Sequence, residues 1–341
     1  MVSSKRVGYA VVGLGFISID AVLPAFKRCK KSRLIAVVSS DAAKAKRLGR
    51  KFHAQASFTY DDFDQCLRMP EVEAIFIATN NGSHVRFTEQ SAASNKHVLC
   101  EKPLANTFDE CKRMIEACRK NNVKLMTAYR KYFDPAALDL KKLIASGKLG
   151  RLKFMHTAFS VNLPPSNQWH LNRQSAGGGA LLDVGVYCVN TSRLVVGQDP
   201  IEAAGGYAWT VDPNRFSEVE ESMAFQLKFP DDLYLQGTAS FGAMQASFLQ
   251  VHGEKGWAAL DPAFAYDEER RLFGKINHKW FERKFKVQDD FQLELDHFSE
   301  CIRKNRAPIP DGAAGARDVQ IMQALYQAAA ANQPVPIPPA S

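Results

Sequence analysis

The stretch GLGFIS, residues 13 to 18, decides how the first half of the chain is interpreted. It overlaps the β-branched run VGYAVVG and leads into SIDAVLPAFKRC, which can form a helix that begins at Ser18. The spacing G-x-G-x-x-S differs in one position from the dinucleotide-binding turn G-x-G-x-x-G, whose glycines permit a tight turn close to a pyrophosphate. The third position needs only a small side chain, so the stretch predicts a strand, a phosphate-binding turn and a helix.

A secretory leader is the competing interpretation, because Lys5 and Arg6 precede the same apolar run. A leader requires an unbroken apolar helix followed by a cleavage site of small residues. Gly8, Gly13 and Gly15 interrupt the run. The glycine turn therefore accounts for more of the sequence than a leader does.

Strands and helices alternate over about the first 130 residues, as in a doubly wound parallel sheet. The expected strands after the first are RLIAVVSS, EAIFIATNN, HVLCEKPL and KLMTAY. The expected helices are DAAKAKRLGRKF, HVRFTEQSAASNK and FDECKRMIEACRKNN. We predict an α/β fold with a dinucleotide-binding domain over residues 1–130.

The second half has a different character and is expected to form an α+β domain over residues 131–341. Strand-like runs are RLKFMHTAFSV, ESMAFQLKF, LYLQGTASF, ASFLQVHG and KWFERKFKV, with FPDDL as a hairpin connection. Two helices, DDFQLELDHFSECIRKN and GARDVQIMQALYQAAAANQ, and an irregular proline-rich tail follow. The alternation predicts an open, largely antiparallel sheet.

One face of this sheet must be covered, either by the chain's own helices or by another subunit. The period-two residues Met223, Phe225, Leu227 and Phe229 form the apolar face in question. We expect a homodimer or homotetramer that covers it.

Composition excludes several classes of protein. The 341 residues carry a formal net charge of +8, but the basic residues gather in KRCKKSR (27–33) and KAKRLGRK (44–51) without interleaved aromatic residues. Specific nucleic-acid binding is therefore not expected. Seven cysteines without C-x-x-C pairs or zinc spacing indicate reduced, mostly buried thiols and no metal site. We see no long unbroken apolar stretch, and we expect a soluble, cytoplasmic protein.

The end of the second strand predicts the cofactor. An acidic residue at this point usually binds the ribose 2′-OH of NAD. Here Ser39 and Ser40 stand in its place, with Asp41 slightly later and Lys44 following. Hydroxyl groups and an ammonium suit a 2′-phosphate, which an acid at position 39 would repel. The sequence favours NADP.

Two further segments carry groups suited to proton transfer. Lys102 precedes Pro103 at the end of an expected strand, where ligands bind in open α/β sheets. Asp183 and Tyr187 are four residues apart and so share a helix face. A tyrosine works as an acid or base near neutrality only if a nearby cation favours its phenolate, and Lys102 is the candidate. A surface lysine and a hydrogen-bonded core pair are the alternatives.

Four segments together resemble the glucose-fructose oxidoreductase and inositol dehydrogenase family, especially its glucose-fructose oxidoreductase branch, which includes aldose and xylose dehydrogenases. They are VVGLGFIS, EKPLA, AYRKYFDPAALDLKKLIASGKLG and NQWHLNRQSAGGGALLDVGVYCVNTSRLVVGQDPIE. The resemblance covers nearly the whole chain. It implies a Rossmann domain, an open mixed sheet and a dimer or tetramer packed through that sheet.

The resemblance also implies roles for particular residues. Lys102 and Asp183 match the active-site lysine and aspartate, and Tyr187 stands where many relatives have histidine. His84 matches a recurrent histidine near the cofactor, although capping the following helix explains it equally well. Trp169 and Arg173 match residues that line the nicotinamide and sugar pocket. The expected cofactor contacts are Gly13, Gly15, Phe16, Ile17, Ser39, Ser40, Lys44, Thr79, Asn80, His84, Glu101, Lys102, Arg130, Trp169 and Arg173.

The hypothesis is a cytoplasmic NADP-dependent sugar (aldose) oxidoreductase that either exchanges its cofactor or retains it while coupling two sugars. The chain starts a few residues before its first strand, without the N-terminal arm of the family's founding member, so export is not expected. A non-catalytic NADP-binding redox sensor and a dehydrogenase of non-sugar diols are the alternatives.

Overall fold

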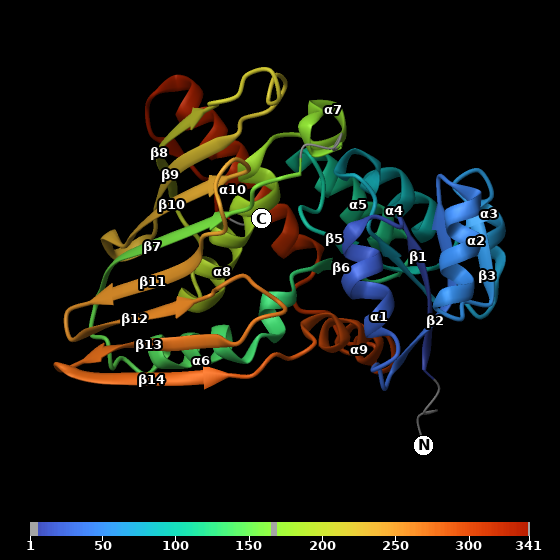
Figure 1. The fold of residues 1–341 in the computed structure, drawn as a ribbon, viewed down its shortest axis with the longest axis horizontal. Coiled ribbons are helices and arrows are strands. Elements are labelled where there is room, and N and C mark those ends of the chain that lie inside the picture. Colours follow the sequence, from blue (N-terminus) through green and yellow to red (C-terminus); the bar gives the residue numbers. More distant parts are fainter. Residues whose placement is uncertain (1–5, 165–168, 340–341) are drawn as a thin grey trace. The chain divides into compact units, whose positions relative to one another are not determined.

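The computed structural model describes residues 6–164 and 169–339, which form two compact units (Figure 1). Unit 1 comprises Met1–Arg130 and Asp289–Ala316, and unit 2 comprises Lys131–Gln288 and Arg317–Ser341. The chain thus returns to unit 1 after most of unit 2 is complete. The linear boundaries expected from sequence, 1–130 and 131–341, do not include this return.

Unit 1 is built on a six-stranded parallel sheet with the strand order β3-β2-β1-β4-β5-β6. Its strands are β1 (Val7–Val12), β2 (Ser32–Ser39), β3 (Ala56–Thr59), β4 (Ala74–Ile77), β5 (His97–Glu101) and β6 (Leu125–Ala128). This order reverses direction between β1 and β4, which is the switch point where doubly wound sheets bind dinucleotides. β1 and β4 are buried along their whole length, as a sheet covered on both faces requires.

Helices connect the strands of unit 1, and their ends follow local hydrogen bonding. They are η1 (Ser18–Val22), α1 (Leu23–Ala25), α2 (Ala42–Lys51), α3 (Phe63–Arg68), η2 (Asn81–Ser83), α4 (His84–Ala93), α5 (Phe108–Lys120) and α9 (Asp290–Arg303). Asp41 caps α2, and Thr107 with Glu110 forms a capping box on α5. α9 packs on β1, β2 and η1, which is why the chain's return belongs to this unit.

Unit 2 contains a nine-stranded sheet with the order β14-β13-β12-β11-β7-β10-β9-β8-β15. Its strands are β7 (Leu152–Ser160), β8 (Glu202–Trp209), β9 (Ser222–Lys228), β10 (Tyr234–Ser240), β11 (Ser247–Gly253), β12 (Gly256–Asp261), β13 (Arg270–Ile276), β14 (Lys279–Phe285) and β15 (Val335–Pro336). Neighbouring strands are antiparallel except for β7 and β10. The expected open, largely antiparallel sheet is confirmed.

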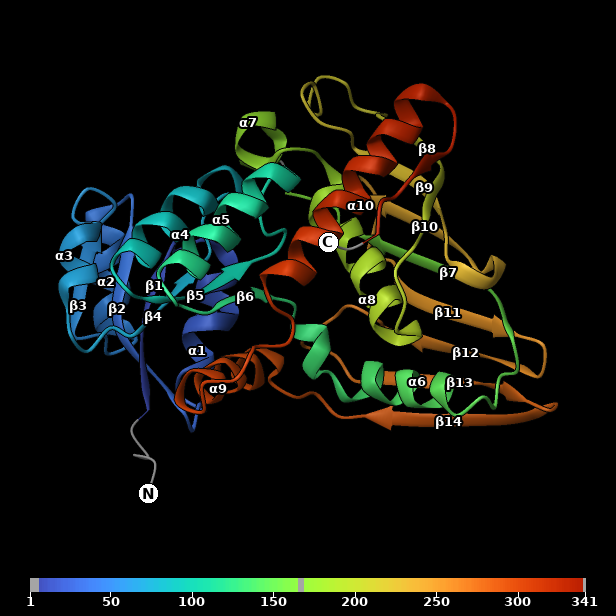
Figure 2. The ribbon, with the colours of Figure 1, turned by 180° about the vertical axis from the view of Figure 1, so that it is seen from behind.

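Helices cover one face of this sheet and leave the other open (Figures 1 and 2). The remaining helices of the described chain are η3 (Arg130–Phe133), α6 (Pro135–Ala145), η4 (Trp169–Leu171), α7 (Arg173–Ala176), η5 (Leu181–Gly185), α8 (Val186–Val196), η6 (Pro230–Asp232) and α10 (Gly312–Ala331). α8 packs on β7 and β10, and α6 packs on β12 and β13. η6 makes the expected hairpin connection between β9 and β10.

The expectation that another subunit covers Met223, Phe225, Leu227 and Phe229 is wrong. All four side chains are buried within the chain. The ring of Phe225 lies against Gly237, whose place on the neighbouring strand leaves room for it. The chain's own helices provide the cover, which was the competing explanation.

Aromatic side chains instead gather on the open face of the sheet. Phe154, His252 and Trp257 occupy paired positions on β7, β11 and β12, and their rings stack in sequence. Trp280 of β14 extends the row and is 55% exposed, and Tyr207 of β8 is 70% exposed. This face is the one left available to a partner.

Several elements were not expected from the sequence. β3, β8, β12, β13 and β15 were missed, and the tail that was expected to be irregular pairs with β8 through Val335 and Pro336. β8 contains Gly205 and Gly206, which are depleted in strands, so local preference gave no signal there.

All seven cysteines are free and buried, as expected. One described stretch, Arg173–Val196, has the length and mean hydropathy (1.2) of a membrane span, and 78% of its most apolar part is buried inside the structure. This stretch supplies the covering helix α8.

A pH-dependent stability follows from His97 at the start of β5. Its Nδ1 accepts a hydrogen bond from the Lys124 backbone N–H (3.0 Å), and burial lowers its pKa to about 4. The unfolded chain therefore binds an extra proton between about pH 6.5 and 4, so the free energy of unfolding falls as the pH is lowered through this range. The variant His97→Gln keeps an acceptor without titrating.

We expect this variant to remove part of the acid destabilisation, up to about 1.4 kcal/mol per pH unit. Denaturant unfolding at several pH values measures the difference between the two slopes. Parallel slopes for wild type and variant would contradict the assignment.

Candidate active site

The carboxyl edge of the unit 1 sheet brings most of the expected cofactor residues together. Because the strands are parallel, the residues that follow them lie at one edge. The glycine turn follows β1, Ser39 ends β2, Thr79 and Asn80 follow β4, Lys102 follows β5, and Arg130 follows β6. Residues spread over more than a hundred positions of sequence thus lie along one edge of the sheet, on both sides of the switch point.

The glycine turn has the geometry that the sequence predicts. Gly13 has φ +93°, and its N–H donates to the Val38 carbonyl at 2.9 Å. A Cβ at this position would lie 2.3 Å from the Ala78 carbonyl oxygen, so only glycine fits between β1 and β4. Ser18 is buried, and its Oγ donates to the Gly13 carbonyl at 2.6 Å. The serine in the third position therefore closes the turn.

The surface above the turn is open, as a bound dinucleotide requires. A Cβ on Gly15 would meet no atom within 4 Å, and the Phe16 side chain is 76% exposed. Ile17 is half-buried and precedes the first helical turn of η1. The residues present fit a pyrophosphate that approaches the backbone at Gly15.

The end of β2 carries hydroxyl groups and an ammonium but no free acid at the expected ribose position. Ser39 is buried, Ser40 is exposed, and Lys44 is half-buried in the first turn of α2. The Asp41 carboxylate accepts the Lys44 backbone N–H at 3.0 Å, and so it serves as the helix cap. This arrangement fits a 2′-phosphate.

The EKP segment places Lys102 directly after β5, half-buried at the sheet edge. Glu101 is buried and its Oε2 accepts the Lys102 backbone N–H at 3.2 Å. Arg130 is buried beneath the same edge with its guanidinium 5.6 Å from the Phe291 ring centroid. The expected lysine is therefore held at the end of a strand.

A buried carboxyl group of α9 was not found from the sequence. Glu294 is buried, and burial together with the nearby Glu101 raises its pKa well above the usual range. The sequence around Glu294 did not indicate that its carboxyl group would be buried near Glu101. That proximity arises because the chain returns to unit 1 and adds α9 to it.

His84 is the first residue of α4 and is fully buried. Its Nδ1 lies 3.2 Å from both the Pro103 and the Leu104 carbonyl oxygens, and its Nε2 lies 3.3 Å from the Thr79 carbonyl oxygen. Burial lowers its pKa to about 4. His84 therefore links the end of β4 to the EKP segment, whereas Asn80 caps η2 by accepting the Ser83 N–H.

In unit 2, Asp183 and Tyr187 lie on consecutive turns of the η5–α8 helix. Between Ala180 and Ser192 these two are the partly exposed residues, and every other residue is buried. The Tyr187 ring packs edge-on against Phe159, with centroids 5.4 Å apart, which fixes its direction. A carboxylate and a phenol are thus presented together from an otherwise buried helix.

Trp169 and Arg173 belong to the segment that precedes this helix. Trp169 is half-buried and stacks on His170, with centroids 3.9 Å apart. Arg173 is exposed, and its Nε donates to the Glu218 carbonyl at 2.8 Å. Residues 167 and 168 at the start of the expected motif lie outside the described residues.

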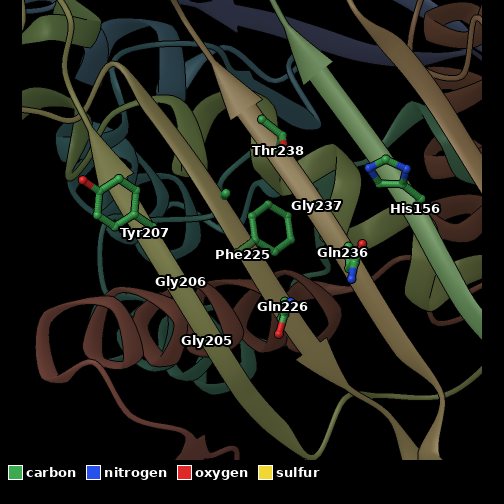
Figure 3. A pocket seen from close by; sticks show the side chains of 10 residues that line it. His156, Gly205, Gly206, Tyr207, Phe225, Gln226, Gln236, Gly237 and Thr238 are labelled. Carbon is green, nitrogen blue, oxygen red and sulfur yellow. The ribbon is translucent and has the colours of Figure 1, made fainter.

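The open face of the unit 2 sheet contains a separate hollow of about 440 Å³ (Figure 3). It lies at Gly205, where a Cβ would meet no atom within 4 Å, and Tyr207, Gln226 and Gln236 also line it. None of the expected site residues lines this hollow, so it belongs to the open face.

Comparison with known proteins gives the family. The family described as "Oxidoreductase family, NAD-binding Rossmann fold" matches residues 7–129, and the GFO/IDH/MocA C-terminal domain matches residues 137–259. The chain belongs to this GFO/IDH/MocA oxidoreductase family, which confirms the resemblance. The fold and the glycine turn described above are those of its nucleotide-binding members.

Individual relatives are similar along nearly the whole chain. D-xylose 1-dehydrogenase [NADP(+)] of Haloarcula marismortui is 31% identical, over 96% of this chain and 92% of the relative. The human trans-1,2-dihydrobenzene-1,2-diol dehydrogenase is 29% identical, over 89% of this chain and 90% of the relative. The crystal structure of aldose-aldose oxidoreductase from Caulobacter crescentus complexed with glycerol is 34% identical, covers 97% of this chain and 100% of that chain, and has a TM-score of 0.92.

Proposed function

We propose that the protein is an NADP-dependent sugar oxidoreductase that acts on CH–OH groups of aldoses. The observation that carries the proposal is the pair Asp183 and Tyr187, which are the partly exposed residues of the otherwise buried stretch between Ala180 and Ser192. The names of the similar xylose dehydrogenase and aldose-aldose oxidoreductase support a sugar as the substrate. The name of the xylose dehydrogenase also supports NADP as the cofactor. A structural core pair would not need to reach solvent.

The cofactor is held by unit 1. The glycine turn receives the pyrophosphate, and Ser39, Ser40 and Lys44 receive the 2′-phosphate through hydroxyl and ammonium groups. Bound NADP supplies the hydride acceptor or donor, and the protein supplies orientation and proton transfer. Trp169 and Arg173 of unit 2 are proposed to contact the nicotinamide end.

The substrate is proposed to meet Lys102 of unit 1 and both residues of the Asp183–Tyr187 pair. Tyr187 takes the proton from the reacting sugar hydroxyl during oxidation and returns it during reduction. Lys102 is proposed to polarise the substrate oxygen through its ammonium charge. Asp183 accepts a hydrogen bond from a neighbouring sugar hydroxyl and so orients the ring.

A non-sugar diol is the second candidate substrate, favoured by similarity to the diol dehydrogenase. A redox sensor remains a different class, but it has no need of a proton-transfer pair. Turnover with a panel of aldoses, polyols and aromatic dihydrodiols separates the three. Absence of turnover together with NADP binding would favour the sensor.

Retention of NADP between turnovers decides whether two sugars are coupled. In a coupled reaction the cofactor oxidised by one sugar is reduced again by another without leaving. The absorbance spectrum and mass of the purified, undialysed protein report whether NADP is bound.

We propose a cytoplasmic protein, because free buried thiols suit a reducing compartment.

A second copy of the chain is proposed to cover the open face of the unit 2 sheet. Phe154, Tyr207 and Trp280 are exposed there to 46%, 70% and 55%. Exposed aromatic residues on one face are typical of subunit interfaces. The assembly is expected to be a homodimer or homotetramer.

The cofactor preference is tested with Ser39→Asp. The new carboxylate repels the 2′-phosphate and can accept the ribose 2′-OH of NAD, so the ratio of NADP to NAD affinity should fall at least about tenfold. Fluorescence titration with both cofactors measures it. Equal affinity of the wild-type protein for NAD and NADP would contradict the assignment of Ser39 and Lys44.

The proton-transfer pair is tested with Tyr187→Phe. Loss of the phenol should lower kcat by about 10² to 10⁴ while the affinity for NADP stays nearly unchanged. Lys102→Met should lower the rate as well, because the substrate oxygen loses the cation that polarises it. Measurement of kcat against pH for both variants checks this. Near-normal turnover of Tyr187→Phe with a lowered Tm would instead indicate a structural pair.

The assembly is tested by light scattering. The wild-type protein should have a multiple of the 37.9 kDa chain mass. A charge on the open face, Tyr207→Glu together with Trp280→Glu, should shift it to the monomer, whereas Ile309→Glu, exposed elsewhere on unit 1, should not. A wild-type mass of 37.9 kDa at all concentrations would exclude the oligomer.

A further inference from the structure

The segment SEVEES, residues 217 to 222, places three glutamates at backbone N–H groups of unit 2. Glu218 accepts the Arg173 N–H at 3.0 Å, and Glu221 accepts the Val211 and Asp212 N–H groups at 2.6 and 3.0 Å. Glu220 lies between them. It is the glutamate that contacts the helix carrying Asp183 and Tyr187.

Glu220 occupies the beginning of that helix with three hydrogen bonds. Its Oε2 accepts the Gly179 N–H at 2.9 Å, and its Oε1 accepts the Leu181 N–H at 3.0 Å. Its backbone carbonyl accepts the Ala180 N–H at 3.3 Å. The helix has no side-chain cap of its own at Ala180, so Glu220 supplies the missing acceptors.

Tyr326 of α10 fixes the Glu220 carboxylate from the other side. Its hydroxyl donates to Glu220 Oε1 at 2.7 Å. Burial is the main cause, and the nearby Glu220 charge the second, of a Tyr326 pKa well above its usual range. Tyr326 therefore remains a hydrogen-bond donor to Glu220. The start of the helix is thus tied to α10 through one carboxylate.

The glycines of the GGG turn are matched to this contact. A Cβ on Gly178 would lie 2.3 Å from the Tyr326 hydroxyl oxygen, and a Cβ on Gly179 would lie 2.0 Å from the Glu220 carbonyl oxygen. The turn therefore lacks side chains where Glu220 and Tyr326 approach. Glycine residues give the turn little stiffness of their own, so its position depends on these two residues.

We propose that Glu220 and Tyr326 are positioning residues that hold Asp183 and Tyr187 in their reactive geometry. This inference rests on the proposed function, because it assigns a purpose to the same pair. Asp183 lies in the first turn of the helix, and its N–H donates to the Gly179 carbonyl at 3.3 Å. A shift of the turn therefore moves Asp183 first and Tyr187 with it.

A displacement of Asp183 and Tyr187 should lower the rate of the proposed reaction. Misplacement of a catalytic group by about 1 Å can cost about 10² in rate. The variant Glu220→Gln keeps the size of the side chain but turns an amide N–H₂ towards one of the N–H donors, which loses at least one hydrogen bond. It also removes a negative charge from the helix N-terminus, where such a charge is favourable.

Glu221 offers a matched control. It is adjacent in sequence and its carboxylate also accepts two backbone N–H groups, but those belong to its own loop and not to the helix. Both N–H groups bond to Oε2, so Glu221→Gln removes the same charge while its amide oxygen can keep both hydrogen bonds. It should lower Tm without changing the position of Asp183.

The experiment compares Glu220→Gln, Tyr326→Phe and Glu221→Gln in the full-length protein, well below the lowest Tm. We expect kcat/KM for the sugar to fall by about 10 to 100-fold in the first two variants and by less than about twofold in Glu221→Gln. The affinity for NADP should stay within about twofold in all three. Tyr326→Phe is the conservative variant should Glu220→Gln fold poorly.

Two results would overturn the inference. If kcat/KM of Glu220→Gln and Tyr326→Phe equals that of Glu221→Gln, the Glu220 contact stabilises the fold and does not position the pair. Tyr187→Phe in the same assay separates this from failure of the proposed function. Normal turnover of Tyr187→Phe overturns both, whereas its loss together with normal turnover of Glu220→Gln overturns the positioning role alone.

Discussion

The parallel pairing of β1 with both β2 and β4 is the constraint on which unit 1 depends. Parallel strands end at one edge, so the turn after β1 and the residues after β2 and β4 meet there whatever their separation in sequence. Gly13 can occupy the narrow space beside Ala78 because it has no side chain. The cofactor site is therefore a consequence of strand order together with one glycine.

Unit 2 uses a different principle to present its groups. The η5–α8 helix is mostly buried, and between Ala180 and Ser192 the partly exposed residues are Asp183 and Tyr187. Burial of the rest makes the helix a rigid support, and the Glu220 carboxylate holds its beginning. The proposed positioning role gives Asp183 and Tyr187 a fixed direction through residues outside the proposed substrate site.

The sequence predicted the parts of the structure that local pattern determines. The glycine turn, the alternating strands of unit 1 and the position of Lys102 after a strand depend on neighbouring residues, and each was found. β8, with its adjacent glycines, has no such pattern, and β15 is only two residues long. The return of α9 to unit 1 could not be predicted, because it depends on contacts with strands more than two hundred residues earlier.

The same limit applied to the site. Spacing placed Asp183 and Tyr187 on one helix, and the structure has them there. Glu220 lies 41 residues after Gly179 and Tyr326 lies on a distant helix, so no periodicity connects either residue with the η5–α8 helix. The apolar face of β9 was recognised correctly as needing cover, yet alternation alone cannot tell a helix from a second subunit. Long-range packing decided both questions.

Transfer of deuterium from a sugar to NADP is the most direct measurement of the central claim. The protein is incubated with NADP⁺ and aldoses that carry deuterium on every carbon, and the reduced cofactor is analysed by mass spectrometry. A sugar oxidoreductase predicts reduced cofactor that carries one deuterium from the sugar carbon. Tight binding of NADP⁺ with no labelled cofactor from any aldose would contradict the account.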